Sequence, residues 1–262
     1  MALSTRRKHA DTVRYSAPAL EKGLDVLEML AAEPHSLSLQ EIAKRLNRSA
    51  SELYRMLDVL VQRGYLARRP DSTYALTLRL FELAQRHPPV DRLLDAAIPN
   101  MQALARRTGQ SNHLCVHHDA RLVVLARAEP PEPMSAMVRQ GAHFAFHDDR
   151  VSARVITAFQ TGERQELLFQ ELVGNGGASA ARRRGLAKRV QAIHACGYDE
   201  GPSDTLSGVI DICFPIFDHY DAVAALTLVY LKQRDAKVSV PGARGAVREA
   251  AQAISRALGW PG

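Results

Sequence analysis

The chain has 262 residues, of which 46% are hydrophobic and 24% charged, so it is long enough for one large domain or two ordinary ones and too apolar for a disordered protein. Its formal charge is +6, a surplus that identifies no partner by itself. No apolar run approaches the ~18 residues of a membrane helix, and the polar first residues lack the apolar core of a signal peptide. Three cysteines are too few for a disulfide scaffold. These features exclude a secreted mini-protein, a membrane protein and a fibrous repeat, and they predict a cytoplasmic location.

Basic residues are concentrated in the first third of the chain. Residues 44–69 hold seven Lys and Arg against two acidic residues, which is typical of surfaces that bind phosphate groups. A solvated basic face is the alternative interpretation of the same pattern. Residues 1–16 hold few apolar side chains, and we expect them to form a flexible arm.

Two serine–glutamate pairs mark the starts of short helices. Apolar residues at helical spacing first predict a helix over 17–32, which Pro34 ends. Ser38 and Ser49 are each followed three residues later by a glutamate, Glu41 and Glu52, and this spacing is that of a capping box. We therefore expect one helix after Ser38 and another after Ser49.

A predicted hairpin completes the first domain. Residues 65–69 and 73–77 have strand composition and flank a Pro-Asp-Ser turn. The order of helices, turn and hairpin predicts a winged helix-turn-helix over residues 17–76. Residues 76–87 form an apolar helical pattern that we expect to pack on this domain and on a partner subunit, within a linker over 77–89 that ends at Pro88-Pro89.

The remaining residues, 90–262, predict helices that flank an antiparallel sheet, so the fold class is α+β. The first predicted helix of this part contains Pro99, which is expected to kink it, and Gly109 ends it. Strands are expected over 111–117, 121–128, 134–139, 209–217 and 222–230, and helices over 150–160, 163–173, 181–196 and up to Leu258.

Short stretches in both parts carry a resemblance to a known family. In the first part they are Ala19–Glu28, Leu37–Ala43, Leu53–Leu57 and Gly64–Leu66; in the second they include Phe144–His147, Cys196–Tyr198 and Pro215–Asp218. In this order and spacing the chain resembles the isocitrate lyase regulator (IclR) family of bacterial transcription factors. The resemblance implies that the first domain, hereafter the head, binds a palindromic DNA operator as a homodimer or a dimer of dimers. It also implies a GAF-like second domain that binds a small metabolite, commonly an organic acid.

The third helix of a helix-turn-helix places its N-terminal residues at base edges in the major groove. The DNA-binding candidates on this helix and on the wing are Ser49, Ser51, Glu52, Tyr54, Arg55, Arg68 and Arg69. Glu52 could accept a hydrogen bond from a cytosine amino group, but capping of Ser49 is the favoured interpretation, and the family more often has a small hydroxyl residue there.

The resemblance also places an effector pocket in the second domain. The positions that it implies for the lining are Ser152, Ala153, Val209, Asp211, Thr227 and Val229, with Arg127 as a carboxylate clamp and Arg154 as its alternative. Asp211 stands where the family often has cysteine, and it either faces the ligand, points to solvent or pairs with an arginine. Asp148-Asp149 would repel an anion at the following helix, so an aromatic, hydroxylated or amine-bearing effector is as compatible as a plain small acid.

Other classes of function have weaker support. His113, Cys115 and His117 alternate on one strand face, but common zinc-ligand spacings are absent, so neither a metal nor a cofactor is predicted. Phosphate-loop, nucleophile-elbow and zinc-protease motifs are also absent, and we do not expect an enzyme. The predicted function is a DNA-binding transcriptional regulator that responds to an organic, aromatic or sugar acid. The alternative is a regulator whose second domain only oligomerises.

Overall fold

The computed structural model describes residues 17–85, 88–174, 179–219 and 221–262. It divides into two compact units, Met1–His87 and Pro88–Gly262, so the division falls at the Pro88-Pro89 pair. The flexible arm predicted for residues 1–16 lies outside the described residues.

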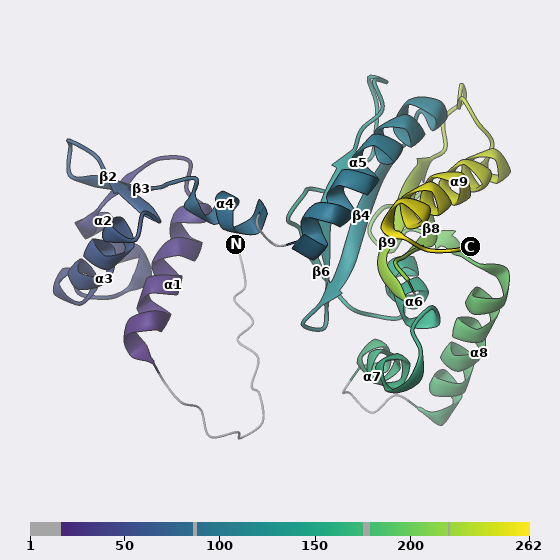
Figure 1. Ribbon diagram of the computed structural model, residues 1–262, viewed down its shortest axis with the longest axis horizontal. Helices are drawn as coiled ribbons and strands as arrows, with labels where there is room; N and C mark the ends of the chain where they lie inside the picture. The colour runs from purple at the N-terminus through teal and green to yellow at the C-terminus, as the bar shows by residue number, and fades with distance from the viewer. Residues whose placement is uncertain (1–16, 86–87, 175–178, 220) are drawn as a thin grey trace. The chain divides into compact units, whose positions relative to one another are not determined.

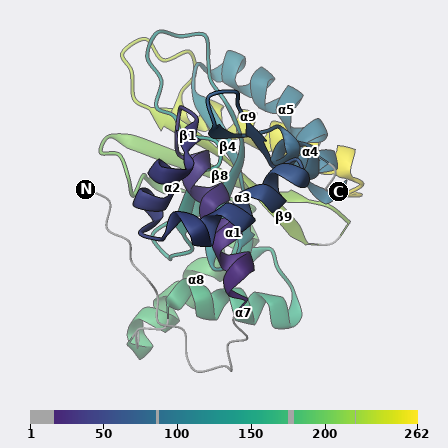
Figure 2. The same ribbon diagram turned by 90° about the vertical axis from the view of Figure 1, so that its left-hand side faces the viewer.

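The first unit packs helices against a small sheet of strand order β1-β3-β2 (Figure 1). Its elements are α1 (Pro18–Ala31), β1 (Leu37–Ser38), α2 (Leu39–Leu46), α3 (Ala50–Gln62), β2 (Leu66–Arg68), β3 (Thr73–Leu76) and α4 (Arg79–Gln85). The first three helices face the viewer in Figure 2. Their apolar stripes meet in one core around Val26, Ile42, Leu53 and Leu57, all fully buried, because residues three and four apart share a helix face.

Both predicted capping boxes are confirmed. Ser38 Oγ accepts a hydrogen bond from the Glu41 amide at 3.3 Å, and a Glu41 carboxylate oxygen accepts one from the Ser38 amide at 2.8 Å. Ser49 and Glu52 repeat the arrangement at 3.3 and 3.0 Å. Each box satisfies amides that have no partner inside the helix, and it fixes where α2 and α3 begin.

Helix α4 starts later than predicted, and residues 86–87 of the predicted helix lie outside the described residues. Leu76 belongs to β3, where it pairs with Leu66, and Thr77 Oγ1 accepts a hydrogen bond from the Arg79 amide at 3.1 Å. The helix therefore starts at Arg79 and not at Leu76. Leu78 and Phe81 remain 73% and 61% exposed in the single chain.

The second unit is a six-stranded sheet with helices on both faces (Figure 1). The strands lie in the order β6-β5-β4-β9-β8-β7, and each neighbouring pair is antiparallel. The elements are α5 (Pro88–Thr108), β4 (Ser111–His118), β5 (Arg121–Ala128), β6 (His143–Ala145), α6 (Val151–Ala158), α7 (Gly162–Val173), α8 (Ala180–Cys196), β7 (Asp199–Pro202), β8 (Val209–Phe217), β9 (Ala222–Leu231) and α9 (Val240–Leu258). The fold class is thus α+β, as predicted.

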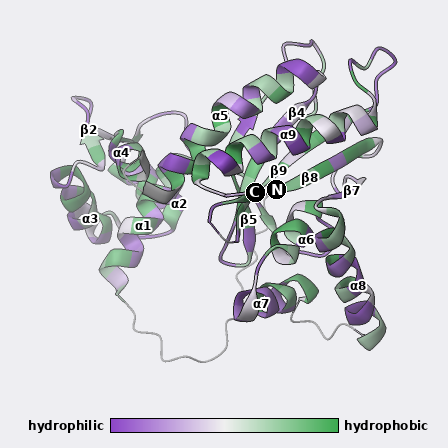
Figure 3. Ribbon diagram, turned by 45° about the vertical axis from the view of Figure 1, so that its right-hand side comes forward, coloured by the Kyte–Doolittle hydropathy of each residue, from purple (hydrophilic) through white to green (hydrophobic). Residues whose placement is uncertain are grey.

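The two faces of this sheet carry separate cores. Leu114, Leu226 and Leu228 pack toward α5 and α9, whereas Cys115 and Ala225 pack toward α6, α7 and α8. This separation follows from the alternation of side chains along each strand. Strands β8 and β9 are mostly hydrophobic because both of their faces are covered (Figure 3).

Two expectations about the strands are wrong. Residues 134–139 form no strand, and the short strand β6 pairs with β5 in their place. Three prolines at positions 130, 131 and 133 lead into this segment, and proline cannot donate to a sheet ladder. Strand β7 escaped prediction because its sequence, Asp-Glu-Gly-Pro, lacks strand composition, yet it pairs with β8 at the sheet edge.

Helix α5 continues through Pro99, where the side chain of Asn100 donates to the Ala96 carbonyl at 2.9 Å. One strand is tied to this helix by a buried amide. Asn112 of β4 donates from its side chain to the Met101 carbonyl of α5 at 3.0 Å. This contact joins the sheet to the helix with which the second unit begins.

Candidate functional site

The N-terminus of α3 is capped, and its acidic residue contacts two partners. One carboxylate oxygen of Glu52 accepts from the amide and hydroxyl of Ser49, and the other lies 3.0 Å from Lys22 Nζ. The hydrogen bond from Lys22, followed by those from Ser49, lowers the pKa of Glu52 to about 2. Glu52 is therefore ionised and engaged with both Ser49 and Lys22, while 44% of its side chain remains exposed.

Exposed donors surround this helix start. Ser51, Tyr54 and Arg55 are exposed on α3, and Arg68 and Arg69 are exposed at the wing. Within the described part of the chain, no carboxylate pairs with these three arginines, although Arg68 donates to the Ser72 hydroxyl at 3.4 Å.

Two other arginines of the basic segment are held internally. Arg45 pairs with Glu33, and Arg48 lies 3.1 Å from Asp25. The structure thus separates the basic segment into arginines engaged within the domain and arginines that remain available to phosphates or bases.

The second unit contains a cavity of about 340 Å³. Its walls come from β4, β5, β6, β8 and β9, from the start of α6 with the residue before it, and from two segments without regular structure. The lining residues are His113, Cys115, Leu122, Val124, Met137, Val138, Arg139, Ala142, Phe144, Arg150, Val151, Ser152, Ser203, Asp204, Thr205, Leu206, Asp211, Thr227 and Val229.

Buried polar groups from α6 and from the sheet line the cavity. The hydroxyls of Ser152 and Thr227 are 3.0 Å apart, and both residues are buried. His113 is 9% exposed, and its Nδ1 has no hydrogen-bond partner among the described residues. Burial lowers the pKa of His113 to about 4, so the ring is neutral at pH 7.

Asp211 places a carboxyl group on the same wall. Burial is the largest influence on this carboxyl group and raises the pKa of Asp211 to about 6. A hydrogen bond from the Ser203 hydroxyl and the charge of Arg150 act in the opposite direction. Burial also raises the pKa of Cys115 to about 12, which keeps this residue a thiol. The cavity thus offers hydroxyls, a neutral imidazole and a carboxyl group within largely apolar walls.

Arg150 brings a positive charge to the cavity from the residue that precedes α6. Its guanidinium group contacts the Asp204 carboxylate at 2.9 and 3.2 Å and lies 4.3 Å from the centre of the Phe144 ring. Arg139 also lines the cavity.

Comparisons with known proteins agree with both units. Residues 19–70 match the IclR helix-turn-helix domain, and residues 90–256 match the family described as "Bacterial transcriptional regulator IclR C-terminal". The chain belongs to the IclR family of transcriptional regulators. The predicted winged helix-turn-helix and the α+β second domain of this IclR protein are therefore confirmed.

Relatives match nearly the whole chain. The HTH-type transcriptional regulator XynR of Escherichia coli is 26% identical over 93% of this chain and 98% of its own length. The glycerol operon regulatory protein of Streptomyces griseus is 25% identical over 92% and 96%. A crystal structure of an IclR homolog complexed with 4-hydroxybenzoate, from Microbacterium hydrocarbonoxydans, is 25% identical, covers 92% and 98%, and gives a TM-score of 0.74. The curated relatives are regulators and not enzymes. Among the described residues, no helix has the length and apolar character needed to span a membrane.

Four of the predicted effector residues of this IclR regulator line the cavity, and two others do not. Ser152, Asp211, Thr227 and Val229 line the cavity. Ala153 and Val209 are buried beside it without lining it.

Neither arginine proposed as a clamp is among the lining residues. Arg127 pairs with Glu129 at 3.1 Å. Arg154 binds the buried Asp199 at 2.6 Å and the Asp148 carbonyl at 2.5 Å. Sequence reasoning missed Arg150, although its position directly before α6 was a signal for it.

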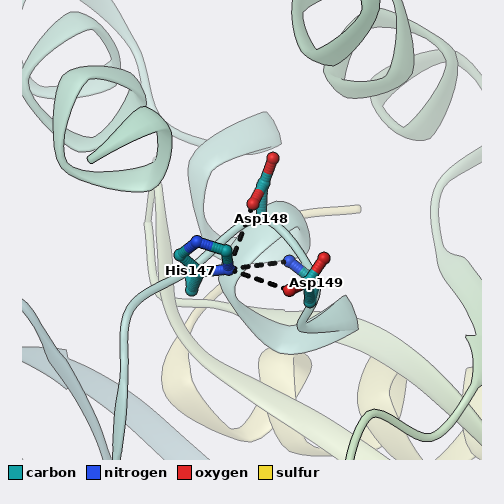
Figure 4. A group of neighbouring side chains, drawn as sticks. All are labelled: His147, Asp148 and Asp149. Atoms are coloured by element: carbon teal, nitrogen blue, oxygen red, sulfur yellow. Dashed lines mark hydrogen bonds and ion pairs between the residues drawn. The ribbon is translucent and has the colours of Figure 1, made fainter. Parts of the chain in front are cut away.

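The alternating histidines and cysteine of β4 do not converge. His113 and Cys115 line the cavity, whereas His117 lies 2.6 Å from Glu171 of α7. A different group with ligand chemistry, His147, Asp148 and Asp149, lies before α6 (Figure 4). The Asp148 carboxylate is already bound by Arg182 at 2.6 and 3.1 Å, so this group is part of an ion-pair network.

Proposed function

We propose that this IclR regulator binds a palindromic operator as a dimer or a dimer of dimers and responds to a small organic, aromatic or sugar acid. The observation that supports the proposed response to an effector is the cavity of about 340 Å³ lined by Asp211 and Thr227. This volume lies at the lower end of the roughly 300–1,000 Å³ typical of small-molecule sites. A second domain that served oligomerisation alone would have no need of a cavity with polar groups in its walls.

The composition of the walls supports an acid with an apolar body. Arg150 and Arg139 supply positive charge, Leu122, Val124 and Phe144 supply apolar surface, and the hydroxyls of Ser152 and Thr227 supply donors and acceptors. The ligand in the crystal structure of one relative, 4-hydroxybenzoate, combines a carboxylate with an apolar ring. Asp211 alone would favour a ligand that bears an amine, but the positive charges of Arg139 and Arg150 would repel such a ligand.

Operator binding is supported by exposed arginines of the first unit that pair with no carboxylate among the described residues. We assign Arg55 of α3 to a guanine or a phosphate and Arg68 and Arg69 to the DNA backbone, because all three side chains are exposed. Because Glu52 is engaged in capping, we assign sequence reading to Ser51, Tyr54 and Arg55. Effector binding then changes operator affinity only as far as the effector prefers one of two states of the protein.

Operator binding is tested by selection of bound fragments from random duplex DNA, followed by titration of the selected sequence. Arg55→Ala should weaken binding by about 1–3 kcal/mol if Arg55 contacts a base. Arg234→Ala, which removes an exposed arginine of the second unit, is the matched control. Equal operator affinity in both variants would show that Arg55 does not contact the operator.

Effector binding is tested by thermal shift against organic acids, aromatic acids, sugar acids and amines. A stabilising acid whose effect is altered in Asp211→Ala, while operator affinity without effector is unchanged, supports the cavity as the sensor. A blank panel with intact operator binding would favour a domain that only oligomerises.

A further inference from the structure

Arg150 already holds a carboxylate inside the cavity, and that carboxylate belongs to the protein. Asp204 lies in the segment between β7 and β8, and its two oxygens contact Nη2 and Nη1 of Arg150 at 2.9 and 3.2 Å. Two parallel contacts of this kind are the geometry with which arginine binds free carboxylates. Both side chains line the cavity, and each is 23% exposed.

The guanidinium group is fixed from its other side. It lies 4.3 Å from the centre of the Phe144 ring, a distance at which a cation is attracted to the face of an aromatic ring. The Phe144 ring is thus a second contact, besides Asp204, that holds the Arg150 guanidinium group in the cavity wall.

The segment that carries Asp204 has few other attachments. The Ser203 amide donates to the Val209 carbonyl at 2.9 Å, and the Thr205 hydroxyl donates to Asp204 itself at 3.1 Å. Residues 204–208 are exposed, and Leu206, which lines the cavity, is 44% exposed. The contact with Arg150 is therefore the main link between this segment and α6.

The cavity is lined by a buried nitrogen, Nδ1 of His113, that makes no hydrogen bond among the described residues. His113 is buried and its Nδ1 is unpartnered among the described residues. A buried polar group without a hydrogen bond costs free energy, and a ligand with a hydrogen-bonding group offers the compensation.

We propose that Arg150 is the anion subsite of this cavity and that Asp204 is its internal occupant, which the carboxylate of the effector displaces. The inference rests on the sensor function proposed above. A single guanidinium fork binds one carboxylate by two hydrogen bonds, and a second carboxylate beside Asp204 meets like-charge repulsion. The ligand class is a compact monocarboxylate whose apolar body contacts Leu122, Val124 and Phe144. On binding, Asp204 leaves Arg150 and residues 203–208 lose their link to α6.

The test uses the full chain and two probes, benzoate and its uncharged counterpart benzyl alcohol, with calorimetric titration. In Asp204→Asn, benzoate should bind on the order of tenfold more tightly than in the parent protein, because the competing carboxylate is gone. Benzyl alcohol should bind both proteins equally. Arg150→Gln should lose benzoate binding, and Asp235→Asn, an exposed carboxylate outside the cavity, should behave as the parent.

Hydrogen exchange of residues 203–208 provides a second readout. Exchange should be faster in Asp204→Asn without ligand, and also in the parent protein when benzoate is added. Benzoate binding that is equal or weaker in Asp204→Asn, or exchange that slows when benzoate binds, overturns the internal-occupant inference and leaves the sensor function standing. If neither protein binds benzoate, the anion subsite is overturned, whereas the sensor function falls only if the wider panel is also blank.

Discussion

Replacing Asp211 by asparagine should stabilise the second unit at neutral pH. Burial raises the pKa of this carboxyl group from 3.8 to about 6, so the folded protein tolerates the acid better than the anion. Two pKa units correspond to about 3 kcal/mol at 1.36 kcal/mol per unit. Because the cavity admits solvent, we expect roughly half of this, about 1–2 kcal/mol, to be measured.

The dependence on pH follows from the direction of the shift. Below about pH 4 the carboxyl is protonated in the folded and unfolded states alike, and the parent and the variant should be equally stable. Between about pH 4 and 6 the unfolded chain ionises first, so the parent loses stability relative to Asp211→Asn. Above that range the difference should stay constant.

Urea denaturation at pH 4.5, 5.5 and 7.5 measures this difference, with the transition of the second unit followed separately. Asp235→Asn is the matched control, because Asp235 is exposed and lies outside the cavity. A variant that is less stable than the parent at pH 7.5, or an advantage that does not grow with pH, would refute the reasoning.

Two further substitutions test the ion pairs and the caps. Asp199→Asn should lower the free energy of unfolding of the second unit by about 3–5 kcal/mol, because Arg154 and Arg189 share this buried carboxylate; a loss below about 1 kcal/mol in urea denaturation would contradict it. Ser49→Ala should destabilise the first unit by about 1 kcal/mol through the lost α3 cap, measured by thermal unfolding against Ser135→Ala, a change at an exposed serine of the second unit; equal stability of the two variants would show that the Glu52 contacts suffice without the hydroxyl.

Local patterns predicted the first unit well because its signals lie within a few residues of each other. Ser38 with Glu41, and Ser49 with Glu52, place two helix starts where the structure has them. The start of α4 was misplaced, because pairing of Leu76 with Leu66 across the hairpin outweighs the helical pattern that begins at the same residue.

The candidate cavity was less predictable because its walls are far apart in the sequence. Thr227 and Asp211 lie on strands whose apolar runs were visible, and the resemblance placed them. Arg150 and Asp204 come from segments without regular structure, and no sequence pattern joins them across 54 residues. Arg127 was favoured for its charge alone, yet Glu129, two residues away, already satisfies it.

Strand β4 presents adjacent residues to two different neighbours. His113 lines the cavity, and Asn112, the residue before it, points to the opposite face and holds the Met101 carbonyl of α5. The two residues share one planar peptide unit. Helix α5 begins at Pro88, where the second unit begins. One residue of β4 therefore lines the cavity, and the residue directly before it holds the helix with which the second unit begins.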